Sequence, residues 1–114
     1  MNNLANVLLQ LRRLAEAETI GRQSMKVLET ALGPKYPRVA TISSNLAAIL
    51  REKPDLPGAR RLYMKALAID EAAYGPNHAE VAVDLQSLAE VLQEMGNTQE
   101  AQRLADRAAS ISTP

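Results

Sequence analysis

The amino-acid sequence predicts an all-α fold, a right-handed superhelix of antiparallel helix hairpins (an α-solenoid) with about 2.5–3 repeats. The chain repeats with a period of 42 residues, so that Gly33-Pro34 returns as Gly75-Pro76. Its composition, rich in Ala and Leu together with Glu, Lys and Arg and without Phe or Trp, is a helix-forming mixture. A fixed period of roughly 20–50 residues is typical of repeat architectures, in which each unit buries its apolar face against its neighbours.

Residues of similar size return at the same phase of each repeat. The sets are Ala17, Ala59 and Ala101; Ile20, Leu62 and Leu104; and Leu4-Ala5, Leu46-Ala47 and Leu88-Ala89. A small side chain at a helix crossing lets two helices approach closely, whereas a larger one holds them apart. We therefore predict that Ala59 and Ala101 are almost fully buried at helix crossings.

The middle unit, from Pro37 to Gly75, shows how one repeat forms two helices. Pro37 suits the first turn of a helix, where its missing N–H would be unpaired anyway. Pro54 ends this helix, because it pushes the residue before it out of helical geometry. Pro57 sits in the first turn of the second helix, which Gly75-Pro76 terminates. Apolar residues at three- and four-residue spacing form the two buried stripes: Val39, Ile42, Leu46, Ile49 and Leu50, then Ala59, Leu62, Tyr63, Ala66, Leu67 and Ile69.

The first unit is expected to be incomplete. Its second helix, about 14–32, is whole, but its first has only residues 1–11 by comparison with Pro37–Lys53. The third unit has a tight turn at Gly96 and two capping-box patterns, Asn77 with Glu80 and Asn97 with Glu100. We interpret the chain as one repeat domain, 1–114, with approximate units 1–36, 37–78 and 79–114, and as a fragment of a longer array.

Composition and charge exclude several classes of protein. Without Cys the chain has neither disulfides nor thiolate metal sites. Residues 1–57 carry eight Lys/Arg against five Asp/Glu, or +3, and residues 58–114 carry five against eight, or −3. This weak dipole lacks the clustered basic face of a nucleic-acid-binding protein. The apolar runs fall short of the ~20 residues that span a bilayer, and the N-terminus lacks the basic residues of a signal peptide. We expect a cytoplasmic protein with no membrane or nucleic-acid partner.

These patterns resemble the tetratricopeptide repeat. Leu46-Ala47 matches the first helix of that family's unit, and Ala59 with Tyr63 matches the second. A tetratricopeptide unit is normally about 34 residues long, and this chain adds eight within 31–40 and 73–82. The longer linker, of the form Leu-Gly-x-x-His-Pro-x-Val-Ala, is similar to the kinesin-light-chain subtype, which is also widespread in bacterial proteins. The resemblance covers nearly the whole chain.

The resemblance implies a function in protein binding. Members of the family hold a peptide or protein segment in a concave groove lined by first helices, where Asn side chains can both donate and accept hydrogen bonds. Carried over by position, the groove residues are Asn3, Asn6, Thr41, Ser44, Asn45, Arg51, Gln86 and Glu90. We therefore expect a protein–protein interaction scaffold with a protein or peptide partner, and Asn45 is its best single match.

Nothing in the sequence predicts an enzyme, a cofactor or a metal site. His78 is the only His and has no second His or Cys to complete a site, so we expect it to cap and pack the next helix. Glu90 and Glu94 lie four residues apart on one helix face, and without a closed pocket or partner base they are expected to form a solvated groove wall. We expect Arg51 to pair with a nearby Glu.

Two alternatives to the peptide-binding scaffold stay open from the sequence. One is a self-association module, and the other is a regulatory repeat domain of a larger multidomain protein. A homodimer through the N-terminal repeat is favoured because a single contact face cannot hide all the large apolar residues of the first helix. These residues are Leu4, Val7, Leu8, Leu9, Leu11 and Leu14.

Overall fold

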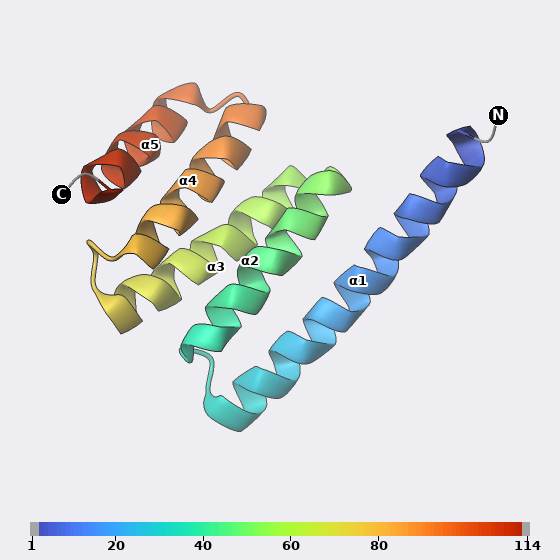
Figure 1. The fold of residues 1–114 in the computed structure, drawn as a ribbon, viewed down its shortest axis with the longest axis horizontal. Coiled ribbons are helices and arrows are strands. Elements are labelled where there is room, and N and C mark those ends of the chain that lie inside the picture. The colour runs from blue at the N-terminus through green and yellow to red at the C-terminus, as the bar shows by residue number, and fades with distance from the viewer. Residues whose placement is uncertain (1–2, 113–114) are drawn as a thin grey trace.

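The computed structural model describes residues 3–112 as five α-helices joined by short turns (Figure 1), with side chains described for residues 10–111. The helices are α1 (Asn3–Leu32), α2 (Pro37–Glu52), α3 (Leu56–Tyr74), α4 (Ala79–Glu94) and α5 (Thr98–Ser112). Each helix packs against the next in chain order, and α2 with α3 and α4 with α5 form antiparallel hairpins. The predicted all-α solenoid of helix hairpins is confirmed.

Proline and glycine place the helix ends where the sequence predicts them. Pro37 opens α2, and Pro57 lies in the first turn of α3. The α3 N-cap is Asp55, whose Oδ1 accepts a hydrogen bond of 3.1 Å from the Gly58 N–H. Gly75 ends α3 with φ of 87°, a backbone conformation that favours glycine because it has no Cβ. Each of these residues determines the backbone conformation next to it, so the helix ends can be predicted from the sequence.

The first unit differs from its predicted form. The sequence predicts separate helices over 1–11 and 14–32, whereas α1 runs from Asn3 to Leu32 without a break. The turns of the other two units contain Pro54-Asp55 and Gly96-Asn97, and the residues at this phase of the first unit are Arg12-Arg13. Arg is a good helix former, so no turn forms and α1 continues.

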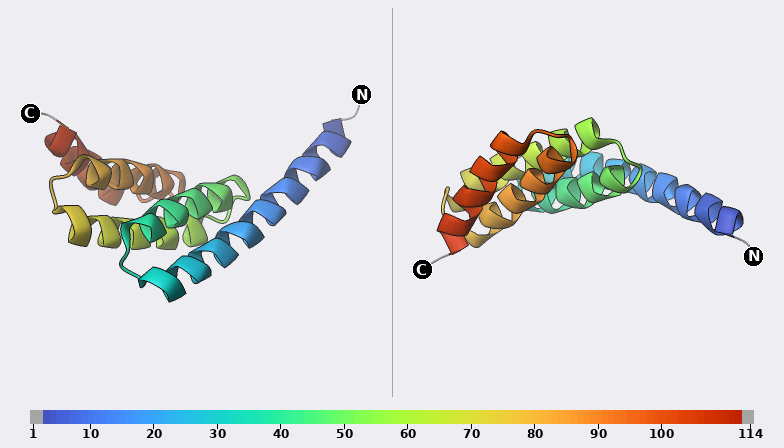
Figure 2. Two further views of the ribbon diagram at one scale, coloured as in Figure 1. Left: turned by 60° about the horizontal axis from the view of Figure 1, so that its bottom comes forward. Right: turned by 90° about the horizontal axis from the view of Figure 1, so that it is seen from above.

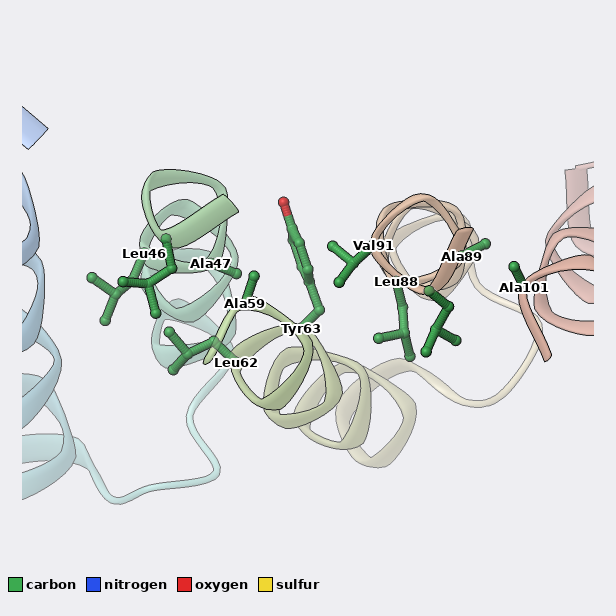
Figure 3. Packing of buried hydrophobic residues seen from close by; sticks show 11 residues of the cluster. Leu46, Ala47, Ala59, Leu62, Tyr63, Leu88, Ala89, Val91 and Ala101 are labelled. Atoms are coloured by element: carbon green, nitrogen blue, oxygen red, sulfur yellow. The ribbon is translucent and has the colours of Figure 1, made fainter. Parts of the chain in front are cut away.

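The core is built around the small residues at repeat phase. Ala59 is fully buried and Ala101 is 3% exposed, which confirms the prediction for both. Ala59 lies beside Ala47 between α3 and α2, and Ala101 lies beside Ala89 between α5 and α4 (Figure 3). Leucine, valine and Tyr63 side chains fill the space around these close helix approaches.

The long α1 gives the molecule an asymmetric shape. It has 30 residues against 16 in α2, which runs antiparallel to it. The N-terminal half of α1 therefore projects past the C-terminal end of α2 (Figures 1 and 2). Among the helices described, none has a stretch both long and apolar enough to cross a membrane.

Candidate functional site

The first helices of the second and third units, α2 and α4, lie along the inner side of the bend (Figure 2, right). On each helix, the side opposite its buried face is exposed to solvent. We call this exposed area the inner surface; it consists of Thr41, Asn45, Ala48 and Glu52 on α2 and Val83, Gln86, Glu90 and Glu94 on α4. Next to it is a hollow of about 480 Å³, lined by Val83 and Gln86 together with Ala108 and Ile111 of α5.

Arg51 joins α2 to α4 across one end of the inner surface. Its Nε donates to Glu94 Oε1 at 2.5 Å, and its Nη1 donates to Glu90 Oε1 at 3.0 Å. The pairing predicted for Arg51 is thus present, with two glutamates rather than one. Burial raises the pKa of Tyr63 beneath this cluster, and the Arg51 guanidinium opposes that shift. Arg51 and Glu90 therefore bridge the two helices through a partly exposed ion pair, and neither presents an unpaired charge to a ligand.

Three other predicted residues present unpaired polar groups on the inner surface. Thr41, Asn45 and Gln86 are exposed, and none of their side chains makes a hydrogen bond or ion pair to another described residue. Ser44 is half-buried and its hydroxyl interacts with Asp84 of α4 rather than facing solvent. The structure brings Thr41, Asn45 and Gln86 onto one surface and directs Ser44 into the helix interface.

The two predicted asparagines of the first unit lie elsewhere. Asn3 and Asn6 belong to the first turns of α1, and their side chains lie outside the described residues. This part of α1 projects away from α2 and α4 (Figure 2) because the helix does not fold back at Arg12-Arg13. The inner surface therefore draws its described residues from the second and third units.

Sequence reasoning missed a pair of buried carboxyl groups at the meeting of α3 and α4. Asp70 is 5% exposed and Asp84 is 4% exposed, and Asp84 Oδ2 has no hydrogen-bond partner among the described residues. Burial, together with the adjacent Asp70, raises the pKa of Asp84 to about 8. The repeat phase holds the signal, because Asp84 and Asp70 stand where the preceding unit has Ile42 and Leu28.

The single histidine has a structural position. His78 is the N-cap of α4, and its Nδ1 accepts a hydrogen bond of 3.0 Å from the Glu80 N–H. Its ring stacks on Tyr74 with 4.5 Å between centroids. The predicted capping role of His78 is confirmed, whereas the capping box of Asn77 with Glu80 is wrong, because the helix begins one residue later. Within the described residues, no three His, Cys, Asp or Glu side chains gather where they could hold a metal ion.

Comparison with known proteins supports the repeat architecture. A family model described as tetratricopeptide repeat matches residues 1–71 and again residues 39–113. The crystal structure of BtubC (BKLC) from P. vanneervenii, a kinesin light chain-like protein, is similar, with a TM-score of 0.83 and 27% sequence identity. The similarity covers 97% of this chain and 44% of that one, so this chain spans less than half the length of BtubC. No curated protein matches the sequence.

Proposed function

The chain belongs to the tetratricopeptide repeat family, and on that premise we propose that it binds an extended peptide or protein segment on the inner surface of α2 and α4. Repeats of this family generally mediate protein–protein interactions and are typically non-catalytic. One observation carries the proposal: the exposed amide of Asn45 has no partner within the described chain. We place this scaffold in the cytoplasm and assign it no cofactor.

The chemistry of an extended segment fits the groups on the inner surface. Such a segment presents a backbone N–H and C=O at each residue, and the Asn45 side chain can satisfy one of each. Gln86 offers the same pair of groups on α4. Val83, which is 60% exposed, supplies an apolar contact beside them. Backbone recognition at two amides and one apolar contact together support binding of an extended chain.

Charge favours a basic side chain at the Arg51 end of the inner surface. Glu90 and Glu94 share the single guanidinium of Arg51, and exposed Glu52 of α2 has no ion-pair partner among the described residues. Glu90 and Glu94 against one guanidinium leave a net negative charge there, while Glu52 shares its hollow with Arg13 of α1. A Lys or Arg of the bound segment is therefore attracted to this end.

The test is a selection of peptides from a random display library on the immobilised protein, followed by affinity measurement on the peptides recovered. Asn45→Ala is expected to weaken them by about 5–30-fold, corresponding to about 1–2 kcal/mol, without changing helix content or melting temperature. Gln23→Ala, an exposed amide on α1, is the matched control and leaves affinity unchanged. Peptides that bind parent, Asn45→Ala and Gln86→Ala equally well would remove the inner surface as the site.

Self-association is a second candidate function, favoured by the exposed apolar side chains of α1. Leu11, Ile20 and Val27 are 49%, 62% and 65% exposed. A homodimer through the N-terminal repeat would bury some of this apolar area and so lower the free energy. Analytical ultracentrifugation of the whole chain tests it, with a concentration-dependent shift from monomer to dimer as the expected result.

A further inference from the structure

Among the described residues, polar side chains join α2 to α4 at two levels. Arg51 contacts Glu90 and Glu94 at one end of the inner surface, through partly exposed ion pairs. Ser44 lies seven residues before Arg51, or about two turns away, and interacts with buried Asp84. The spacing of the two helices therefore depends on an exposed link at one level and on a buried link at the other.

The buried link lies beside the groups that are proposed to hold a peptide. Ser44 directly precedes Asn45 on α2, and Asp84 directly follows Val83 on α4. Asn45 and Val83 are exposed on the inner surface, whereas Asp84 is only 4% exposed. A movement of α4 against α2 at Asp84 would therefore change the distance between groups that face the same ligand.

The carboxyl group of Asp84 places different demands on its surroundings with and without its proton. With the proton, it can donate an O–H to the carboxylate of Asp70, which is 5% exposed on α3. Without the proton, two negative charges face each other in the core, and Asp84 Oδ2 has no hydrogen-bond partner among the described residues. A buried carboxylate without donors is strongly destabilised unless water reaches it. Ionisation therefore favours a separation of the helices that admits water to Asp84.

The groups around Asp84 act against its ionisation. Burial is the largest cause that raises the pKa of Asp84, followed by Asp70 of α3 and then by Glu80 of its own helix. The Ser44 hydroxyl of α2 acts in the opposite direction, because it stabilises the ionised form, and the resulting pKa is about 8. On α5, which also packs against α4, the arginines pair with other residues: Arg103 with Glu100, and Arg107 with Glu71.

We propose that the Asp70–Asp84 pair couples peptide binding on the inner surface to the protonation of Asp84. The peptide is held while Asp84 keeps its proton and α4 stays close to α2, and it is released when ionisation separates the two helices. This regulation rests on the proposed function, because it needs a peptide that bridges α2 and α4. A peptide that selects the protonated form takes up a proton on binding, so its affinity falls as the pH rises through about 8.

The first experiment measures peptide affinity as a function of pH. The probe is a display-selected peptide recovered at about pH 6.5, N-acetylated and free of His and Cys, so that it does not itself titrate between about pH 7 and about pH 9. Binding to the protonated form alone predicts a dissociation constant that rises about tenfold over that range, because the competent fraction falls to about one tenth. Asp84→Asn should bind with constant affinity, because its amide does not ionise.

Two matched variants should shift the pH profile in opposite directions. Asp70→Asn removes a carboxylate that raises the pKa of Asp84, so the fall in affinity should persist and move to lower pH. Ser44→Ala removes the hydroxyl that favours the ionised form, so the fall should move to higher pH. A purely structural role for these residues would change affinity equally at every pH. Circular dichroism at each pH checks that helix content stays constant.

The second experiment needs no peptide. The chain has no Cys, so Thr41→Cys combined with Val83→Cys places one spin label at an exposed position of each helix. Electron paramagnetic resonance then measures the distance between labels on α2 and α4. This distance should lengthen over the same pH range in the parent background and stay constant in the Asp84→Asn background.

The outcomes separate the proposed function from its regulation. Peptides that bind parent, Asn45→Ala and Gln86→Ala equally well at every pH overturn the inner surface as the site, and the regulation with it. Binding that depends on Asn45 but has the same pH profile in parent and Asp84→Asn leaves the proposed function standing and overturns the regulation. A label distance that does not change with pH, or a loss of affinity that follows a loss of helix content, also overturns the regulation. A fall in affinity that Asp84→Asn abolishes, together with a longer label distance, supports it.

Discussion

Helices α1 and α3 carry residues of the same repeat phase, yet α3 buries some that α1 leaves exposed. Leu62 and Ile69 of α3 are 8% and 6% exposed, whereas Ile20 and Val27, at the same phases of α1, are 62% and 65% exposed. Helix α3 folds back on α2, the first helix of its own unit, but α1 is continuous through Arg12-Arg13 and has no such partner. Burial at a repeat phase therefore depends on whether the turn folds the unit back, and not on the residue alone.

The largest difference in stability effect between α1 and α3 is expected when the alanine at the same repeat phase, Ala17 or Ala59, is replaced by leucine. Ala59→Leu should lower the free energy of unfolding by about 1–3 kcal/mol, because Ala59 is fully buried and extra methylenes overpack the α2–α3 crossing. Ala17→Leu should change it by no more than about 0.5 kcal/mol, because Ala17 is only partly buried on α1. Urea unfolding followed by circular dichroism measures both. Equal losses in the two variants would contradict the comparison.

The repeat phase made most of the fold predictable from sequence. The ends of α2 and α3 follow from Pro37, Pro57 and Gly75, and the buried alanines follow from their return at one phase. These signals are local or strictly periodic, so a single sequence displays them. The first unit was predicted wrongly. A turn was expected at Arg12-Arg13 because the other two units turn at this position of the repeat, but the Pro and Gly residues that cause those turns are absent there.

The candidate site was less predictable, because it depends on how helices from different units face each other. Arg51 was expected to pair with a glutamate, but its simultaneous contact with Glu90 and Glu94 depends on the approach of α2 to α4. Ser44 was assigned to the ligand surface, although it is turned toward Asp84. Neighbouring residues on a helix, such as Ser44 and Asn45, can differ in whether they face solvent or another helix. The repeat pattern alone does not show which of them faces solvent.

A second contrast between repeat units concerns charge in the core. The second unit has apolar Ile42 at the phase where the third has Asp84, and the first has Leu28 where the second has buried Asp70. A carboxyl group buried without a full set of partners destabilises the folded state once it is ionised. The part of the array around α3 and α4 should thus lose stability as pH rises, whereas the contact of α1 with α2, where Lys53 lowers the pKa of Glu18, should lose stability only at acid pH.

Asp84→Asn should test this contrast with an intermediate effect. The pKa of Asp84 is raised from 3.8 to about 8, mainly by burial and then by Asp70. The folded state thus holds the proton more tightly than the unfolded chain, and the free energy of unfolding should fall as pH rises from about 4 to about 8. The variant should remove most of this fall and be more stable than the parent by about 1–2 kcal/mol at pH 8. Parallel pH profiles for parent and variant, from thermal unfolding, would contradict the assignment.

The smallest effect on global stability is expected from a change at Arg12 and Arg13, the positions where α1 continues as a helix while the other two units turn. Replacing Arg12 and Arg13 by the residues at the same phase of the third unit, as Arg12→Gly with Arg13→Asn, should break α1 near residue 12, because Gly disfavours a helix interior by about 1 kcal/mol relative to Ala. Global unfolding should shift by no more than about 0.5 kcal/mol, since these residues are exposed beyond α2. Amide hydrogen exchange at dilute, monomeric concentration should speed up for residues 5–11 and stay unchanged for α3. The control, Arg12→Ala with Arg13→Ala, keeps a strong helix former at both positions and should leave exchange as in the parent. Continued protection of residues 5–11 in the Gly-Asn variant would mean that the missing turn residues are not what makes α1 continuous.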